Sequence, residues 1–167
     1  MAQDGMLRSI VYQFVASPEE PLPPSPVAAA ASFGTHDLAR FAGYLLGRDL
    51  EARVSAGELS ETAALLERDR RGAIRAALEA EGDGVGLAAA LEGFLGYLAR
   101  LDAAYVVVDL GDLLLDEEQE NRPGTSGDEA WRHRAISSLE ELALDGAAGR
   151  RVVLAACGRV PMTVAPR

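Results

Sequence analysis

Two residue types that often build catalytic and metal sites are scarce in this sequence. It contains one cysteine, Cys157, and two histidines, His36 and His133. A lone cysteine excludes an intramolecular disulfide and any zinc cluster built on cysteines, and it fits a reducing compartment. The two histidines are far apart and no known ligand spacing surrounds them, so we expect neither a metal site nor a metal cofactor.

Long apolar runs and positive charge are also lacking. No uncharged apolar stretch reaches the roughly 18 residues that a membrane helix needs, and the N-terminus lacks a signal-peptide pattern. Lysine is absent, and 26 acidic residues outnumber 16 basic ones, which gives a net charge of −10. Such a surface repels a polyanion. We therefore expect a cytoplasmic protein with neither nucleic acid nor membrane as a partner.

Apolar residues nevertheless make up 49% of the 167-residue chain, which excludes intrinsic disorder and suits about one domain. Residues 7–15, 27–33 and 105–110 are rich in β-branched, aromatic or small apolar side chains and predict strands. The last run shows no alternation, as expected of a strand covered on both faces. Five prolines in residues 18–26 predict an extended connection that cannot be helical.

Stretches with helical spacing of apolar residues follow these strands. The predicted helices are residues 38–46, 58–81, 87–101, 113–119 and 128–144. Residues 152–157 are compatible with a further strand. The alternation of strands and helices predicts an α/β fold with one parallel sheet. A closed barrel needs eight strands, so if this sheet belongs to a barrel, the chain holds only part of it.

Polar residues stand directly after the second predicted strand. In parallel α/β folds, functional side chains lie at the carboxyl ends of strands, where Thr35, His36 and Asp37 fall. The structural alternative is that Thr35 or Asp37 caps the next helix while His36 satisfies a backbone group. A catalytic triad of Ser32, His36 and Asp109 is a further alternative, but no nucleophile-elbow motif supports it.

Two features follow the third predicted strand. The acidic run of Asp116, Glu117, Glu118 and Glu120 predicts a solvated helix end. After it comes Asn121-Arg122-Pro123-Gly124-Thr125, in which Pro-Gly fixes a turn whose flanking amide and hydroxyl groups can contact a ligand. The same residues are also compatible with a simple turn. Trp131, the single tryptophan, is predicted to pack in the core.

Four segments, taken together, resemble a known family. They are Gly5-Met6 with strand 7–14, Phe33–Asp37 with Ala42-Gly43-Tyr44, Val106–Leu115, and Glu120–Thr125 with Trp131-Arg132. In order and separation they are similar to the C-terminal part of the amylomaltases, the bacterial 4-alpha-glucanotransferases or disproportionating enzymes of glycoside hydrolase family seventy-seven. The resemblance covers roughly residues 5–144. It departs from the family at Ala130, where asparagine is usual, and at His133, where arginine is common.

This resemblance implies a fold and an organisation. The fold is the C-terminal portion, about three βα units, of a (β/α)8 TIM barrel with added helices. Residues 1–149 are then a partial catalytic barrel, and residues 150–167 are a tail of unclear structure. The implied partners are maltooligosaccharides or α-1,4-glucans and the earlier part of the barrel.

The resemblance also implies an activity. Segments of α-1,4-glucan are transferred between maltooligosaccharides by a retaining mechanism, without a cofactor. Asp37 matches the carboxylate that stabilises the transition state, and His36 a group that hydrogen-bonds the same sugar. Thr35, Asn121, Pro123, Gly124 and Thr125 match substrate-binding positions. The family's nucleophilic aspartate and acid/base glutamate belong to earlier strands, so the chain alone is expected to be inactive.

Two functions from other classes stay open at this point. One is a non-catalytic helical interaction module, in which residues 58–81 and 87–101 present apolar faces to a partner protein. The other is a small independent α/β hydrolase that uses Asp37 and His36.

Overall fold

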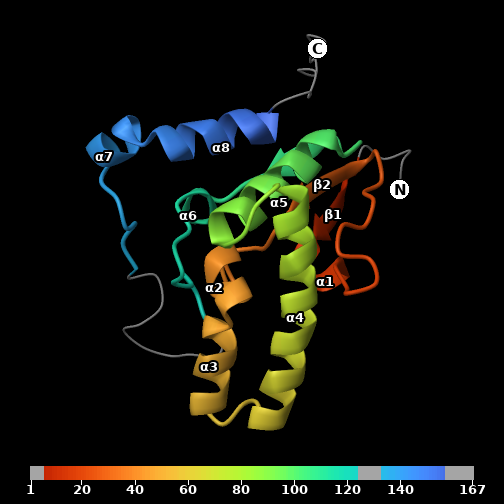
Figure 1. Cartoon of the computed structure of the whole chain (residues 1–167), viewed down its shortest axis with the longest axis vertical. Coiled ribbons are helices and arrows are strands. Elements are labelled where there is room, and N and C mark those ends of the chain that lie inside the picture. The colour runs from red at the N-terminus through yellow and green to blue at the C-terminus, as the bar shows by residue number, and fades with distance from the viewer. Residues whose placement is uncertain (1–5, 124–132, 157–167) are drawn as a thin grey trace.

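A small parallel sheet forms one layer of the structure. The computed structural model describes residues 6–123 and 133–156. In that part of the chain, β1 (Arg8–Val11), β2 (Ala29–Ser32) and β3 (Tyr105–Val107) pair in this order, and both pairings are parallel. The three predicted strands and the parallel α/β arrangement are thus confirmed (Figure 1).

The first strand is shorter than predicted. It ends at Val11, and the following residues form a helical turn, α1 (Tyr12–Val15), although their β-branched and aromatic content predicted strand. Tertiary contacts override this propensity. The Tyr12 hydroxyl donates to the carbonyl of Pro23 at 3.1 Å, and the Gln13 amide donates to the carbonyl of Ala39 at 2.7 Å. The predicted non-helical connection over residues 18–26 is confirmed.

Helices α2 (Phe41–Leu46), α3 (Arg48–Ser55), α4 (Glu61–Glu81) and α5 (Leu87–Arg100) connect β2 to β3. Three of them match predicted helices, whereas α3 was not predicted. Ser60 caps α4 by accepting a hydrogen bond from the backbone N–H of Ala63. Figure 1 shows α3 and α4 side by side, with their joined ends far from the sheet.

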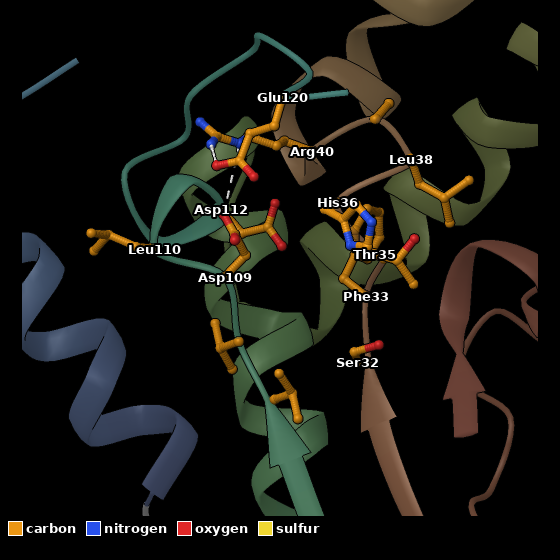
Figure 2. Close-up of a pocket in the computed structure, with 14 residues that line it drawn as sticks. Ser32, Phe33, Thr35, His36, Leu38, Arg40, Asp109, Leu110, Asp112 and Glu120 are labelled. Atoms are coloured by element: carbon orange, nitrogen blue, oxygen red, sulfur yellow. Dashed lines mark hydrogen bonds and ion pairs between the residues drawn. The ribbon is translucent and has the colours of Figure 1, made fainter. Parts of the chain in front are cut away.

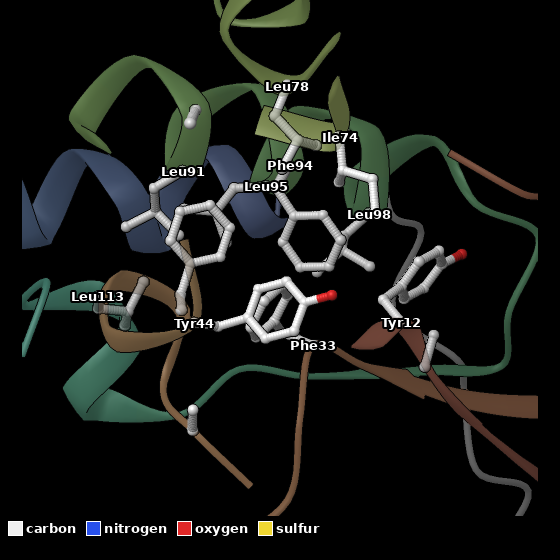
Figure 3. Close-up of a cluster of buried hydrophobic side chains, with 14 of the residues drawn as sticks. Tyr12, Phe33, Tyr44, Ile74, Leu78, Leu91, Phe94, Leu95, Leu98 and Leu113 are labelled. Carbon is white, nitrogen blue, oxygen red and sulfur yellow. The ribbon is translucent and has the colours of Figure 1, made fainter. Parts of the chain in front are cut away.

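The hydrophobic core lies between the sheet and the helices α4 and α5 (Figure 3). Ile74 and Leu78 of α4 meet Leu91, Leu95 and Leu98 of α5 there. These side chains form the apolar faces that the interaction-module alternative would present to a partner. Since they are buried within the chain, that alternative loses its main support. Aromatic rings close the core on the sheet side, namely Tyr12, Phe33, Phe41, Tyr44 and Phe94.

The part after β3 differs most from the predictions. Its helices are α6 (Leu110–Leu113), α7 (Leu139–Leu144) and α8 (Gly146–Ala156). The predicted helix 113–119 is wrong, because Leu115 adopts a left-handed conformation with φ of 57°. The predicted helix 128–144 is wrong over residues 133–138, and residues 128–132 lie outside the described residues.

The strand predicted over residues 152–157 is also wrong. Residues 152–156 belong to α8, and Cys157 lies outside the described residues. Helix α8 packs against α5 and buries Ala148 and Arg151, while Val152 and Val153 remain exposed. Packing of α8 against α5 therefore makes these residues helical, although their β-branched content predicted a strand. The predicted division between residues 149 and 150 falls inside this helix.

One face of the sheet is open in the described structure. Val106 and Val108 point toward the core, whereas Tyr105 and Val107 are 50% and 57% exposed. The expectation that this segment is covered on both faces is therefore wrong for this chain. Within the described residues, β1 and β3 each pair on one side only, so both edges of the sheet are open as well.

Candidate functional site

A pocket of about 330 Å³ lies beyond the carboxyl ends of β2 and β3. Figure 2 shows Thr35, His36 and Arg40, which follow β2, opposite Asp109 and Asp112, which follow β3. Adjacent parallel strands end at the same edge of the sheet, which brings these two segments together although they are distant in sequence.

The predicted residues after β2 form a short exposed turn. Thr35 Oγ1 accepts a hydrogen bond from the backbone N–H of Asp37 at 3.4 Å, and His36 Nε2 lies 3.4 Å from Asp37 Oδ1. The side chains of His36 and Asp37 are 57% and 44% exposed. They do not cap the next helix, because the backbone N–H of Phe41 donates to Asp112 Oδ1 at 2.7 Å.

Asp37 and Asn121, predicted to share a site, are in direct contact. Asn121 Nδ2 donates to Asp37 Oδ1 at 2.5 Å. Gln119 Nε2 donates to the carbonyl oxygen of Asp37 at 2.9 Å and to that of Asn121 at 2.6 Å. The turn after β2 and the segment after α6 are thereby joined at the predicted carboxylate.

A second pocket, of about 380 Å³, lies along the same turn. Asp37 and Pro123 line it together with Gln119 and with Phe14 of α1. The Phe14 side chain is 71% exposed, so its ring is available to a ligand. Thr35 and His36 line the first pocket instead. Gly124 and Thr125, the remaining predicted binding residues, lie outside the described residues, as does Trp131.

Arg40 is the centre of an ionic network that the sequence did not reveal. Its guanidinium donates to the carboxylates of Asp116 and Glu120, and its Nε lies 3.7 Å from Asp109 Oδ1. Asp116 Oδ2 also lies 2.6 Å from His133 Nε2. The solvated helix end predicted for this acidic run is wrong for Asp116, whose side chain is only 2% exposed. Opposite charges from a distant segment explain its burial.

The acidic segment also packs closely against α2. A Cβ atom at Gly43 would overlap the carbonyl oxygen of Glu117, and one at Gly111 would overlap the Arg40 guanidinium. Gly43 therefore requires glycine, because the backbone of Glu117 occupies the space, whereas a side chain at Gly111 would displace the Arg40 guanidinium from its ion pairs. Arg48 Nε donates to Glu117 Oε2 at 2.7 Å. Residues 114–123, which we term the acidic strap, are thus fastened to α2 and the residues that flank it.

A second group of charges forms one wall of the second pocket. Arg71 is buried, donates to both carboxylate oxygens of Asp49 at 2.6 and 2.8 Å, and lies 3.8 Å from the centre of the Tyr44 ring. Arg70 donates to both oxygens of Glu67 and, at 2.7 Å, to the Tyr44 hydroxyl. The hydrogen bonds from Arg70 lower the pKa of Glu67 to about 2. These ion pairs fix the wall of the pocket.

Asp112 is a buried carboxyl group at the floor of the site. Burial raises its pKa to about 7, and the nearby Asp109 adds to this effect, while the hydrogen bond from Phe41 N–H and the charge of Arg40 act in the opposite direction. An unfolded chain releases this proton at its ordinary pKa of 3.8. Between these values the folded chain keeps a proton that the unfolded chain has lost.

Stability is therefore expected to fall as the pH rises from about 4 to about 7, by on the order of 4 kcal/mol from Asp112. In D112N an oxygen still accepts from Phe41 N–H but nothing ionises, so this loss should disappear. Denaturant unfolding of the complete protein at several pH values measures it, with E118Q, a change of an exposed carboxylate, as control. Equal pH dependence in wild type and D112N would contradict the assignment.

The three residues of the catalytic-triad alternative line the first pocket, but the carboxylate of one of them is already engaged. Ser32, His36 and Asp109 all line it. Asp109 caps α6 by accepting from the backbone N–H of Gly111 at 2.7 Å, and it faces Arg40. Among residues 6–123 and 133–156, no group of histidine, cysteine, aspartate and glutamate is arranged to hold a metal ion. In the same residues, no helix has the length and apolar character needed to cross a membrane.

Arg40, Asp112 and Gln119 are residues of the candidate site that sequence reasoning missed. No local pattern marks them, because each acts through a partner from another segment. The one sequence feature that could have indicated them is the density of carboxylates in residues 116–120, because such a cluster must be either paired with a cation or hydrated by solvent. The geometry as a whole offers an exposed carboxylate, Asp37, with amide groups around it. Such an arrangement can bind the hydroxyl groups of a polar ligand.

Comparisons with known proteins bear on the family and the fold. The structure is similar to the crystal structure of amylomaltase from Corynebacterium glutamicum, with a TM-score of 0.75 and 26% sequence identity. The match covers 95% of this chain and 26% of that one, so the chain spans about a quarter of the amylomaltase. A search of the curated proteins gives no significant match. The sequence model of glycoside hydrolase family 77, described as 4-alpha-glucanotransferase, matches residues 1–138, and the chain therefore belongs to this family.

Proposed function

We propose that this chain provides the C-terminal part of the catalytic barrel of an amylomaltase-type 4-alpha-glucanotransferase. The enzyme transfers α-1,4-glucan segments between maltooligosaccharides with retention of configuration. The observation that carries this proposal is the Asp37 carboxylate, which follows β2, keeps 44% of its side chain exposed and is held at Oδ1 by Asn121. Family membership and the place of this carboxylate beyond the sheet support it.

The roles of the residues follow from retaining chemistry. One carboxylate attacks the anomeric carbon while an acid protonates the leaving oxygen, and the glycosyl-enzyme bond is then broken by an acceptor hydroxyl that the same group deprotonates. We assign the nucleophile and the acid/base to the part of the barrel outside residues 1–167. Asp37 accepts sugar hydroxyl groups and stabilises positive charge on the ring, and His36 hydrogen-bonds the same sugar. Thr35 shapes their turn, while Asn121, Pro123, Gly124 and Thr125 bind glucan.

The partner of the chain is the earlier part of the barrel. The strands and helices of this chain are then βα units of that barrel. Helix α8, which spans the predicted boundary at residues 149 and 150, belongs with them because it packs against α5. The open sheet face with Tyr105 and Val107, and the open edges of β1 and β3, support this arrangement because a barrel would cover both. The acidic surface and the lack of lysine suit a cytoplasmic enzyme that acts on uncharged glucans.

The test is maltotriose disproportionation by the complete enzyme that contains this segment. Glucose and longer maltooligosaccharides should appear together, and the anomeric configuration of the products, followed by NMR, should be retained. Hydrolysis to glucose and maltose without longer products would contradict a transferase. Inversion of configuration would contradict the retaining mechanism.

N121A is expected to raise KM for maltotriose by about tenfold, because Asn121 contributes a polar group to the cleft, and to lower kcat by about tenfold, because its hydrogen bond orients Asp37. Folding should be unaffected, because the side chain is only half-buried. Steady-state kinetics measure the effect. Arg122→Ala, at the next position, tests whether any change at the turn has the same result. Unchanged kinetics in N121A would show that residues 121–125 serve only as a turn.

A further inference from the structure

We infer that Gln119 is a positioning residue of this site, which acts on substrate through Asp37 and Asn121. This inference rests on the proposed function and deepens it. Gln119 does not align the two residues through their side chains. Its single amide nitrogen holds their backbone carbonyl groups, one from the turn after β2 and the other from the acidic strap.

Both hydrogen atoms of the Gln119 amide are used in this arrangement. A primary amide has two N–H donors, and the two carbonyl acceptors lie 2.9 Å and 2.6 Å from Nε2. The bridge fixes the distance between the backbones of Asp37 and Asn121. At that distance Asn121 Nδ2 reaches Asp37 Oδ1, and this hydrogen bond orients the partly exposed carboxylate.

Arg40 holds the backbone on either side of Gln119. Its guanidinium contacts Asp116, three residues before, and Glu120, one residue after. Asp116 Oδ1 accepts in addition from the backbone N–H of Glu118 at 3.1 Å. The position of the Gln119 backbone is therefore set by the ionic network, independently of the amide. Loss of the Gln119 side chain should leave the acidic strap in place and free only its tip, where Asn121 lies.

A positioning role of Gln119 and a role in stabilising the fold predict different effects of its loss. Asp37 needs a fixed orientation mainly when charge develops on the sugar, so a looser Asn121 should lower kcat more than it raises KM. Neither carbonyl group is deeply buried, so water can replace the lost hydrogen bonds and the fold should keep its stability.

The test compares Q119A with E118A in the complete enzyme. Glu118 is the adjacent residue. Its side chain is exposed, and the hydrogen bond to Asp116 comes from its backbone N–H, which E118A keeps, so E118A controls for any change in the acidic strap. Q119A should lower kcat by about tenfold with an unchanged melting temperature, and E118A should match wild type. Should Q119A not be soluble, Q119E keeps the side-chain volume but removes the donors, and it should show the same loss.

A double-mutant cycle decides whether Gln119 acts through Asn121. In the N121A background, Q119A should have an effect below about twofold, because the group that it positions is already gone. A loss of the same size in both backgrounds would overturn the inference and show a merely structural role. Wild-type kcat in Q119A would overturn it as well.

The proposed function fails by a different result. If D37N keeps wild-type turnover, Asp37 has no role in transfer and the proposed function itself is wrong. If D37N is impaired while Q119A matches wild type, only the inference about Gln119 is wrong.

Discussion

D37N is expected to lower kcat of the complete enzyme by about 100-fold or more, the usual result of losing a preorganised group that meets transition-state charge. Asparagine has nearly the same shape, and its carbonyl oxygen can still accept a hydrogen bond from Asn121. The change therefore removes negative charge while it keeps the turn after β2. Because the charge matters most when the sugar ring becomes positive, KM should change much less than kcat. Initial rates of glucose release from maltotriose provide the measurement.

Asp102 offers a matched control for this variant. It is an exposed aspartate in the segment before β3, whereas the site lies beyond the carboxyl end of that strand. D102N makes the same chemical change, and we expect wild-type kinetics. A D37N enzyme with near wild-type kcat would remove Asp37 from the catalytic residues. Equal losses in both variants would point to the net charge of the protein instead.

The 167-residue chain by itself is expected to release no glucose from maltotriose above background. The nucleophile and acid/base are assigned to another part of the barrel, and the remaining groups contribute only secondary terms. We also expect self-association and a thermal transition without cooperativity, because the open sheet face exposes Tyr105 and Val107 beside two unpaired strand edges. Co-expression with the earlier part of the barrel should restore both a cooperative transition and activity.

Two single-residue variants test whether the open sheet face causes the self-association of the chain. V107D places a charge on the open sheet face, so it should reduce self-association of the chain but prevent rescue by the rest of the barrel. L66D places the same charge on α4, where Leu66 is exposed away from the sheet, and rescue should proceed. A cooperative, monomeric transition of the unmodified chain would instead indicate an independent domain. Transferase activity of the chain alone would refute the assignment of the catalytic carboxylates.

The elements that sequence predicted correctly are those whose signals are local. The parallel strands stand out by composition, and α4 and α5 by the helical spacing of their apolar residues. The errors occur where contacts with a distant segment determine the local conformation. Residues 12–15 turn into a helix because Tyr12 and Gln13 find partners on other segments. Residues 152–156 become helical because α8 packs against α5.

The candidate site was predictable only where its residues carry a local sequence signal. Position at the carboxyl end of a strand was enough to select Thr35, His36 and Asp37, and the Pro-Gly turn pointed to Asn121. The contact between Asp37 and Asn121 depends on the acidic strap, whose path is set by Arg40. The residues around Arg40 form no sequence pattern that indicates an ion pair with the carboxylates of the acidic strap. Arg40 and Gln119 could therefore be recognised only in the structure.

The pairing of β2 with β3 has a consequence for how the site comes into existence. Ala31 pairs with Val106, and the whole stretch from α2 to α5 lies between them in sequence. Contacts between residues so far apart in sequence form slowly, because closing the long intervening loop costs conformational entropy before the contacts can stabilise it. Helices α4 and α5 are neighbours in sequence and can dock early. We expect β3 to join after this helix pair. Since Gln119 and Asn121, whose side chains donate to Asp37, both follow β3, we expect the proposed glucan site to be among the last parts of the described chain to form.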